Sequence, residues 1–128
     1  MASLLVDTHV VLWHVLDDAR LGPAPTALIE AEDAEVLVSI ASLWEIAIKQ
    51  ALGKLEAPDD LPTRLPDLGF GMLAIEAEHA WAVRGLPHHH RDPFDRLLIA
   101  QAQVERLTIL TSDPAFASYA VETIWDPA

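Results

Sequence analysis

Four acidic side chains stand in this sequence at places where a charge is unexpected. Asp7 and Asp113 each close a short run that is mostly apolar, and Glu45 and Asp95 lie among bulky apolar residues. A carboxylate in such a setting is awkward on a surface and costly in a core unless it is paired. These acids could hold a divalent cation, provided that the fold brings them together.

The apolar patterns that must position these acids alternate between strand and helix. Short runs typical of buried strands lie at 3–6, 36–39, 72–75 and 108–111, with a weaker run at 122–125. Helices are predicted at 10–16, 26–34, 40–52, 77–84 and 93–106. This alternation predicts an α/β fold over a single domain, residues 1–128. Its central, mostly parallel sheet of four to five strands would be covered by helices on both faces.

Local signals define several element ends. Ser39 is placed to cap the helix that follows it, and Gly53 lies where a left-handed residue would end that helix. Asp92 followed by Pro93 is typical of an N-cap and the first helical position. Acidic residues crowd 30–35, the end of another predicted helix. There they oppose the helix dipole, so we expect that end to be exposed and frayed.

Parallel strands bring their carboxyl ends to one edge of a sheet, which is where such folds bind ligands. Asp7 and Asp113 would each close a strand at that edge. Glu45 lies in the helix after the second strand, and Asp95 in the first turn of a later helix. Each acid also has a structural explanation: Asp7 and Asp113 could cap the helices that follow them. Glu45 could pair with Lys49 four residues later, and Asp95 suits a helix N-terminus.

Taken together, the four carboxylates indicate a metal site. Each close pair of carboxylates is repulsive by about 1–4 kcal/mol, depending on the effective dielectric. Few basic residues lie near them in the sequence, so we expect a bound divalent ion to offset the repulsion between the carboxylates. Oxygen ligands, with no cysteine and no organised set of histidines, favour Mg²⁺ or Mn²⁺ over Zn²⁺. The predicted chemistry is metal-assisted hydrolysis of a phosphodiester.

The composition limits the kinds of partner and compartment. The chain has 128 residues with 20 acidic and 8 basic side chains, a net charge of −12. This argues against a broad basic surface for nucleic acid, but not against nucleic-acid chemistry mediated by a cation. Cysteine is absent, which excludes disulfides and thiolate chemistry. No signal-peptide pattern is present, and no apolar run reaches the roughly 18–20 residues of a membrane helix. We therefore expect a soluble, cytoplasmic protein without membrane contact.

The motifs that carry the acids resemble those of a known family. They are Leu5-Val-Asp-Thr-His9, Ser42-Leu-Trp-Glu-Ile46, His90-Arg-Asp-Pro-Phe-Asp-Arg-Leu-Leu-Ile-Ala100 and Leu110-Thr-Ser-Asp113. In order and spacing, over nearly the whole chain, they resemble the PIN-domain ribonucleases, with the VapC toxins of type II toxin–antitoxin systems as the best match. The resemblance implies a PIN-like three-layer fold and a Mg²⁺-dependent endoribonuclease.

The resemblance also implies roles for individual residues. The metal-binding and catalytic quartet would be Asp7, Glu45, Asp95 and Asp113. Supporting residues would be Thr8, Ser112 and Asp92. Asp95 matches the family pattern better than Asp92, because it lies closer to the apolar stretch 97–100. The implied partners are an RNA substrate, a second copy in a homodimer, and an antitoxin, through which alone the protein would contact DNA.

Other residues of chemical interest have structural explanations of similar weight. Arg91 and Arg96 are candidates for phosphate contacts, although pairing on the helix surface explains them equally well. The histidines at 88–90 suit a solvated loop near the site, because three consecutive side chains do not readily face one ion. The spacing of the four tryptophans favours packing in the core over a platform for base stacking, although one of them could lie in a dimer interface; these are Trp13, Trp44, Trp81 and Trp125.

Two other functions fit parts of the pattern. A small phosphatase would use Asp7 as its nucleophile, but it would want a second acid at position 9, which is His9, and a lysine to steady the phosphate. A PIN-like module without catalytic activity would only bind a partner, and it would not need all four acids. Cleavage of RNA that depends on Mg²⁺ and stops with EDTA separates the nuclease from the inactive module.

Overall fold

The computed structural model describes residues 3–126, which fold around a parallel sheet. The strands are β1 (Ser3–Val6), β2 (Glu35–Ser39), β3 (Gly71–Leu73), β4 (Thr108–Leu110) and β5 (Thr123–Ile124). Their order across the sheet is β3-β2-β1-β4-β5, and every neighbouring pair is parallel. The predicted α/β fold with a central parallel sheet is confirmed.

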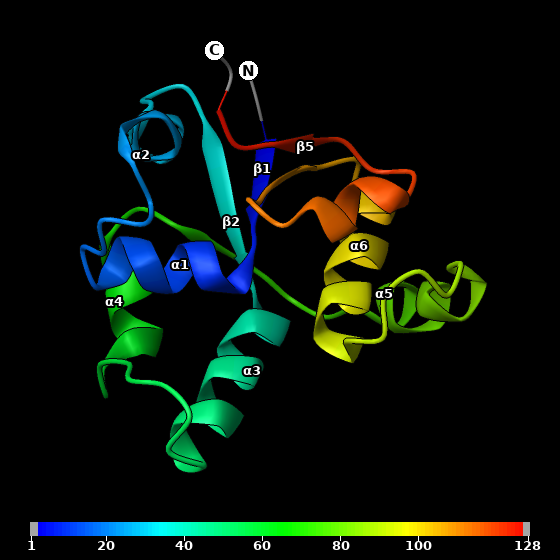
Figure 1. The fold of residues 1–128 in the computed structure, drawn as a ribbon, viewed down its shortest axis with the longest axis horizontal. Coiled ribbons are helices and arrows are strands. Elements are labelled where there is room, and N and C mark those ends of the chain that lie inside the picture. Colours follow the sequence, from blue (N-terminus) through cyan, green and yellow to red (C-terminus); the bar gives the residue numbers. More distant parts are fainter. Residues whose placement is uncertain (1–2, 127–128) are drawn as a thin grey trace.

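Helices cover both faces of this sheet. They are α1 (Thr8–Val15), α2 (Pro23–Glu30), α3 (Ile40–Ala51), α4 (Leu61–Asp67), α5 (Ala77–Ala82), α6 (Pro93–Glu105) and the 3₁₀ helices η1 (Val83–Gly85) and η2 (Pro114–Ser118). In Figure 1, α1, α2 and α4 lie to one side of the sheet, and α5 and α6 lie to the other, which makes three layers. No helix within residues 3–126 is long and apolar enough to cross a membrane.

The central strand β1 is buried on both faces. Leu4 and Val6 pack into the apolar cluster formed with α1, α3 and α4, and Leu5 packs into the cluster formed with α6 and η2. A strand covered on both sides is apolar without alternation, because both sets of side chains leave water. Asp7 is therefore the first polar side chain at the carboxyl end of this strand.

The N-termini of α3 and α6 are capped by side chains, as the sequence predicts. Ser39 Oγ accepts a hydrogen bond from the backbone N–H of Ala41 at 3.0 Å. Asp92 Oδ1 accepts hydrogen bonds from the backbone N–H groups of Phe94 at 2.8 Å and Asp95 at 3.1 Å. Pro93 occupies the first helical position, where no N–H is needed. These contacts determine where α6 begins, and so where the side chain of Asp95 projects.

The prediction for α2 was wrong at both ends. The helix was expected at 26–34 and instead spans Pro23–Glu30. Proline is tolerated in the first helical turn, so Pro23 and Pro25 begin this helix instead of preceding it. The helix ends before the acidic segment 31–35, where carboxylates would oppose the helix dipole.

Two of the four tryptophans lie on the surface, contrary to the prediction of core packing. Trp44 is 56% exposed and Trp81 is 67% exposed. Trp13 and Trp125 are half-buried and pack edge to face at 6.0 Å between ring centroids. Apolar residues at helical spacing show which face of a helix is apolar. They do not show whether that face packs against the same chain or against another one.

Candidate metal centre

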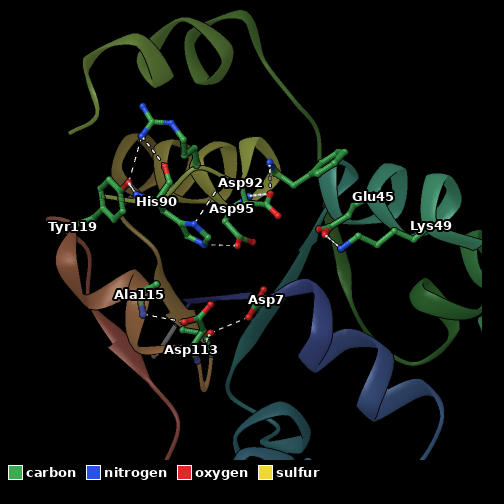
Figure 2. A network of polar contacts seen from close by, with 12 residues as sticks. Asp7, Glu45, Lys49, His90, Asp92, Asp95, Asp113, Ala115 and Tyr119 are labelled. Carbon is green, nitrogen blue, oxygen red and sulfur yellow. Dashed lines mark hydrogen bonds and ion pairs between the residues drawn. The ribbon is translucent and has the colours of Figure 1, made fainter. Parts of the chain in front are cut away.

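The carboxyl edge of the sheet gathers three of the predicted acids. Asp7 follows β1, Asp113 follows β4, and Asp95 lies in the first turn of α6. Figure 2 shows their carboxylates and the ring of His90 pointing into the same space. One oxygen of Asp95, one oxygen of Asp113 and one ring nitrogen of His90 all lie within 4.8 Å of one another. His90, Asp95 and Asp113 therefore form one close group, and Asp7 is tied to it through Thr111.

The hydroxyl of Thr111 links two of these acids. Thr111 Oγ1 donates a hydrogen bond to Oδ2 of Asp7 at 2.9 Å and accepts one from the backbone N–H of Asp113 at 3.0 Å. Asp113 Oδ1 in turn accepts the backbone N–H of Ala115 at 2.9 Å, which is the predicted cap of η2. Thr111 was not predicted from the sequence, because only the pairing of β4 with β1 brings it to Asp7.

Asp7 is buried, and its side chain forms no capping hydrogen bond to α1. Burial raises the pKa of this carboxyl, and the charge of Asp113 raises it further. The hydrogen bond from Thr111, the charge of His9 and the backbone N–H of Thr8 act in the opposite direction. Since burial dominates, the ionised form of Asp7 is costly without a cation.

The pKa of Asp95 is also raised. Burial, followed by the charges of Asp7 and Asp92, raises the pKa of Asp95 from 3.8 to about 7. Its side chain is 15% exposed, and its Oδ2 lies 2.7 Å from Nε2 of His90. A carboxyl in this position retains a proton on part of the molecules at neutral pH, unless positive charge is supplied nearby.

Glu45 approaches the same space from α3. It is 2% exposed, and its Oε2 accepts a hydrogen bond from Lys49 Nζ at 2.6 Å, the pair expected from their spacing. Its other oxygen, Oε1, is buried and has no hydrogen-bond partner within residues 3–126. Glu45 is not in the close group with Asp95, but its charge contributes to the raised pKa there.

This donor set fits a divalent cation. Ionised carboxylates that repel one another, one of them with an unsatisfied buried oxygen, are stabilised when a cation binds between them. Carboxylate oxygens are the ligands that Mg²⁺ and Mn²⁺ take up in proteins. The imidazole of His90 adds a nitrogen donor that was not predicted as a ligand.

The three residues predicted to support the site differ in what they contact. The side chain of Thr8 ties α1 to α3, because its Oγ1 donates a hydrogen bond to Ser42 Oγ at 2.8 Å, whereas its backbone N–H bonds to the carboxyl of Asp7. Asp92 caps α6, and its charge raises the pKa of Asp95. Ser112 is exposed, and over the described part of the chain it has no hydrogen bond to any of the four acids.

Arg96 does not fit the phosphate contact expected from the sequence. The side chain is buried, and its guanidinium donates hydrogen bonds of 2.7–3.4 Å to Val83 O, Leu86 O, Pro87 O, His90 O and Tyr119 Oη. These bonds join α6 to the loop that carries His90. Arg91, the other candidate, is exposed.

A cleft beside Glu45 is lined by several basic side chains, which were not predicted to lie together. It measures about 650 Å³ and lies between α1 and the end of α3. Three basic side chains line it: Lys49, Lys54 and Arg20. Arg20 pairs with Asp18 at 2.7 Å and Lys49 pairs with Glu45, whereas Lys54 is exposed and forms no ion pair with any described residue.

Comparison with known families gives the identity of this fold. Residues 4–122 match the PIN domain family. The chain belongs to the PIN domain family. The family predicted from the four motifs is thus confirmed, while a comparison with curated proteins gives no significant match.

Solved structures of similar fold include a toxin–antitoxin complex and two further proteins, VapBC2 and FitAcB. VapBC2 from Rickettsia felis, bound to a DNA fragment from its promoter, has a TM-score of 0.72 at 13% identity, over 97% of this chain and 99% of that chain. A toxin–antitoxin complex from Klebsiella pneumoniae has a TM-score of 0.62 at 18% identity, over 94% and 95%. FitAcB from Neisseria gonorrhoeae has a TM-score of 0.60 at 20% identity, over 94% and 96%. At these identities the likeness establishes the fold of the PIN domain.

The buried guanidinium of Arg96 should contribute to stability. We expect Arg96→Met to lower the free energy of unfolding by about 2–4 kcal/mol, because several buried carbonyls lose their donor. Arg91→Met, at an exposed position in the loop before α6, should change it by less than about 0.5 kcal/mol. Urea unfolding followed by circular dichroism measures both. Equal stability of the two variants would contradict the structural role of Arg96.

The raised pKa of Asp95 predicts a stability that depends on pH in metal-free protein. Because the folded pKa of about 7 exceeds the ordinary value of 3.8, the contribution of this group is complete below pH 3.8 and lost as the pH rises through about 7. We compare the free energies of unfolding of the wild-type protein and of Asp95→Asn in EDTA. Between about pH 4 and pH 8 the free energy of unfolding should fall by on the order of 1–2 kcal/mol more in the wild type than in the variant. Parallel urea-unfolding profiles for the two proteins would exclude this effect.

Proposed function

We propose that this PIN domain is a Mg²⁺-dependent endoribonuclease, with Mn²⁺ as a possible substitute, and the toxin of a cytoplasmic toxin–antitoxin pair. The observation that carries the nuclease is the close group of Asp95 and Asp113 with His90 at the carboxyl edge of the sheet, where the charges of Asp7 and Glu45 also act on Asp95. The toxin assignment is supported by the motifs and by the toxin–antitoxin complexes among the similar structures.

The four acids would hold the ion and orient the reacting groups. A divalent ion bound there supplies a Lewis acid that polarises the phosphate and activates water. Asp7 and Asp113 are held by Thr111, so they need little rearrangement when the substrate arrives. Asp95 would lose its proton when positive charge is supplied, which makes its carboxylate available as a ligand.

The substrate backbone would enter along the cleft that adjoins Glu45. Lys54 is free to contact a phosphate there, and Lys49 already faces the acids through its bond to Glu45. The net charge of −12 leaves no long basic track for nucleic acid. RNA binding should therefore release few counterions and depend weakly on salt.

We propose two protein partners, a second copy and an antitoxin. Four apolar side chains follow one face of α3 at intervals of four residues and are 37%, 56%, 37% and 63% exposed, namely Ile40, Trp44, Ile48 and Leu52. A stripe along a helix axis is complementary to its own copy across a two-fold axis, so we assign it to a homodimer. The acidic surface suits a basic segment of the antitoxin, which would also supply any contact with DNA.

Substitution of the central acids tests the nuclease. Asp7→Asn and Asp95→Asn should each reduce Mg²⁺-dependent cleavage of single-stranded RNA by roughly 100-fold or more, because the ion loses a charged ligand. Cleavage is measured on protein freed of any co-purifying partner, with EDTA as the metal-free reaction. Asp33→Asn, an exposed acid before β2 at the opposite edge of the sheet, is the matched control and should cleave normally.

Two results would overturn this assignment. Equal cleavage by wild-type protein and by both variants would mean that the site lies elsewhere. A wild-type protein that binds divalent ions but cleaves no RNA with Mg²⁺ or Mn²⁺ would favour the inactive, partner-binding module.

The exposed stripe predicts the effect of a charge on self-association. Trp44→Glu should give a particle with the mass of one chain, 14.0 kDa, because a buried unpaired carboxylate is incompatible with an apolar interface. Trp81→Glu alters an equally exposed tryptophan on α5 and should remain dimeric. Size-exclusion chromatography with light scattering gives both masses. A monomeric wild-type protein, or a dimeric Trp44→Glu, would contradict the assignment.

A further inference from the structure

One histidine of the 88–90 run differs from its two neighbours. His88 and His89 are exposed, whereas His90 is partly buried and its ring turns toward the carboxylates (Figure 2). A ring nitrogen of His90 lies within 4.8 Å of an oxygen of Asp95 and an oxygen of Asp113. The run as a whole is a solvated loop, as expected, but its last member belongs to the candidate metal centre.

The position of His90 is determined by contacts on three sides. Its backbone N–H donates a hydrogen bond to Tyr119 Oη at 2.7 Å, and its carbonyl accepts one from Arg96 at 3.4 Å. Its ring packs perpendicular to that of Phe116, at 6.3 Å between centroids. The imidazole is therefore held in place before any ligand binds, which reduces the entropy lost on coordination.

The nitrogen that faces the acids has no hydrogen bond. His90 Nε2 is buried and forms an ion-pair contact of 2.7 Å with Asp95 Oδ2, which lacks the geometry of a hydrogen bond, and it has no hydrogen bond to any other described atom. The other ring nitrogen, Nδ1, accepts only a long hydrogen bond of 3.5 Å from the backbone of Asp92. Because Nδ1 accepts in this bond, the proton of a neutral ring lies on Nε2, against Asp95. An ion at Nε2 would take the place of that proton, and the ring would then carry its proton on Nδ1 at the loss of the long bond alone.

We propose that His90 is a nitrogen ligand of the ion held by Asp95 and Asp113, and that it shifts the preference of this site from Mg²⁺ toward first-row transition ions such as Mn²⁺. Mg²⁺ retains oxygen ligands and water, whereas imidazole binds transition ions more strongly. The inference rests on the proposed metal-dependent function, and it changes the donor set from oxygen alone to oxygen with one nitrogen.

Mn²⁺ is the probe that tests this ligand directly. Pulsed electron paramagnetic resonance of Mn²⁺ bound to the wild-type protein should detect a directly coordinated ¹⁴N nucleus, and His90→Gln should remove that coupling. Titration should show Mn²⁺ affinity in His90→Gln reduced by roughly 10-fold, with Mg²⁺ affinity within about 2-fold of wild type. A variant with His9, His88 and His89 all replaced by Gln should keep the coupling, and it tests the assignment even if His90→Gln does not fold.

The possible results separate this inference from the proposed function. Bound Mn²⁺ without ¹⁴N coupling in the wild type, or coupling that persists in folded His90→Gln, would show that His90 contacts Asp95 without binding the ion. Coupling that is lost in the triple variant would likewise overturn the assignment. A wild-type protein that binds neither Mn²⁺ nor Mg²⁺ would refute the metal centre itself, and with it the proposed ribonuclease.

Discussion

Repulsion among closely placed carboxylates, two of them buried, is the constraint on which this site depends. The parallel sheet brings Asp7 and Asp113 to one edge, and the start of α6 adds Asp95 beside them. Burial and mutual repulsion raise the pKa values of Asp7 and Asp95, so the metal-free protein holds this arrangement at a cost in stability. The buried apolar strands and both clusters that flank them provide the stability that offsets it.

The structure holds these acids in place without neutralising most of their charge. The uncharged hydroxyl of Thr111 donates to the carboxylate of Asp7 and accepts from the backbone N–H of Asp113. Arg96 follows Asp95 directly in the sequence, yet its guanidinium is bonded to carbonyls and to Tyr119 instead of to the acids. Among the described residues only Lys49 forms an ion pair with an acid of the quartet through a lysine or arginine side chain. The remaining negative charge is therefore available to attract a cation.

Two surface features of this PIN domain adjoin the acids: a cleft beside Glu45 and an exposed apolar stripe on α3. Three of the eight basic residues line the cleft beside Glu45, together with three acids, Asp18, Glu45 and Glu56, so this cleft is locally balanced in a chain with a net charge of −12. The exposed apolar stripe on α3 lies on the helix that carries this acid, and Trp44 packs edge-on against Phe94 at the start of α6. The exposed stripe and this aromatic contact thus lie on the two helices, α3 and α6, that also supply Glu45 and Asp95.

Residue order and apolar periodicity determined the strands, the α/β class, the caps at Ser39 and Asp92 and the positions of the four acids, because these follow from signals within a few residues. Only the tertiary structure decided which neighbours these residues meet. Thr111 reaches Asp7 through the pairing of β1 with β4, which joins distant segments. Asp95 and Arg96 are adjacent, but consecutive helical side chains point about 100° apart, so one enters the site and the other supports the loop of His90. Such directions depend on what packs around the helix, and no local pattern contains that information.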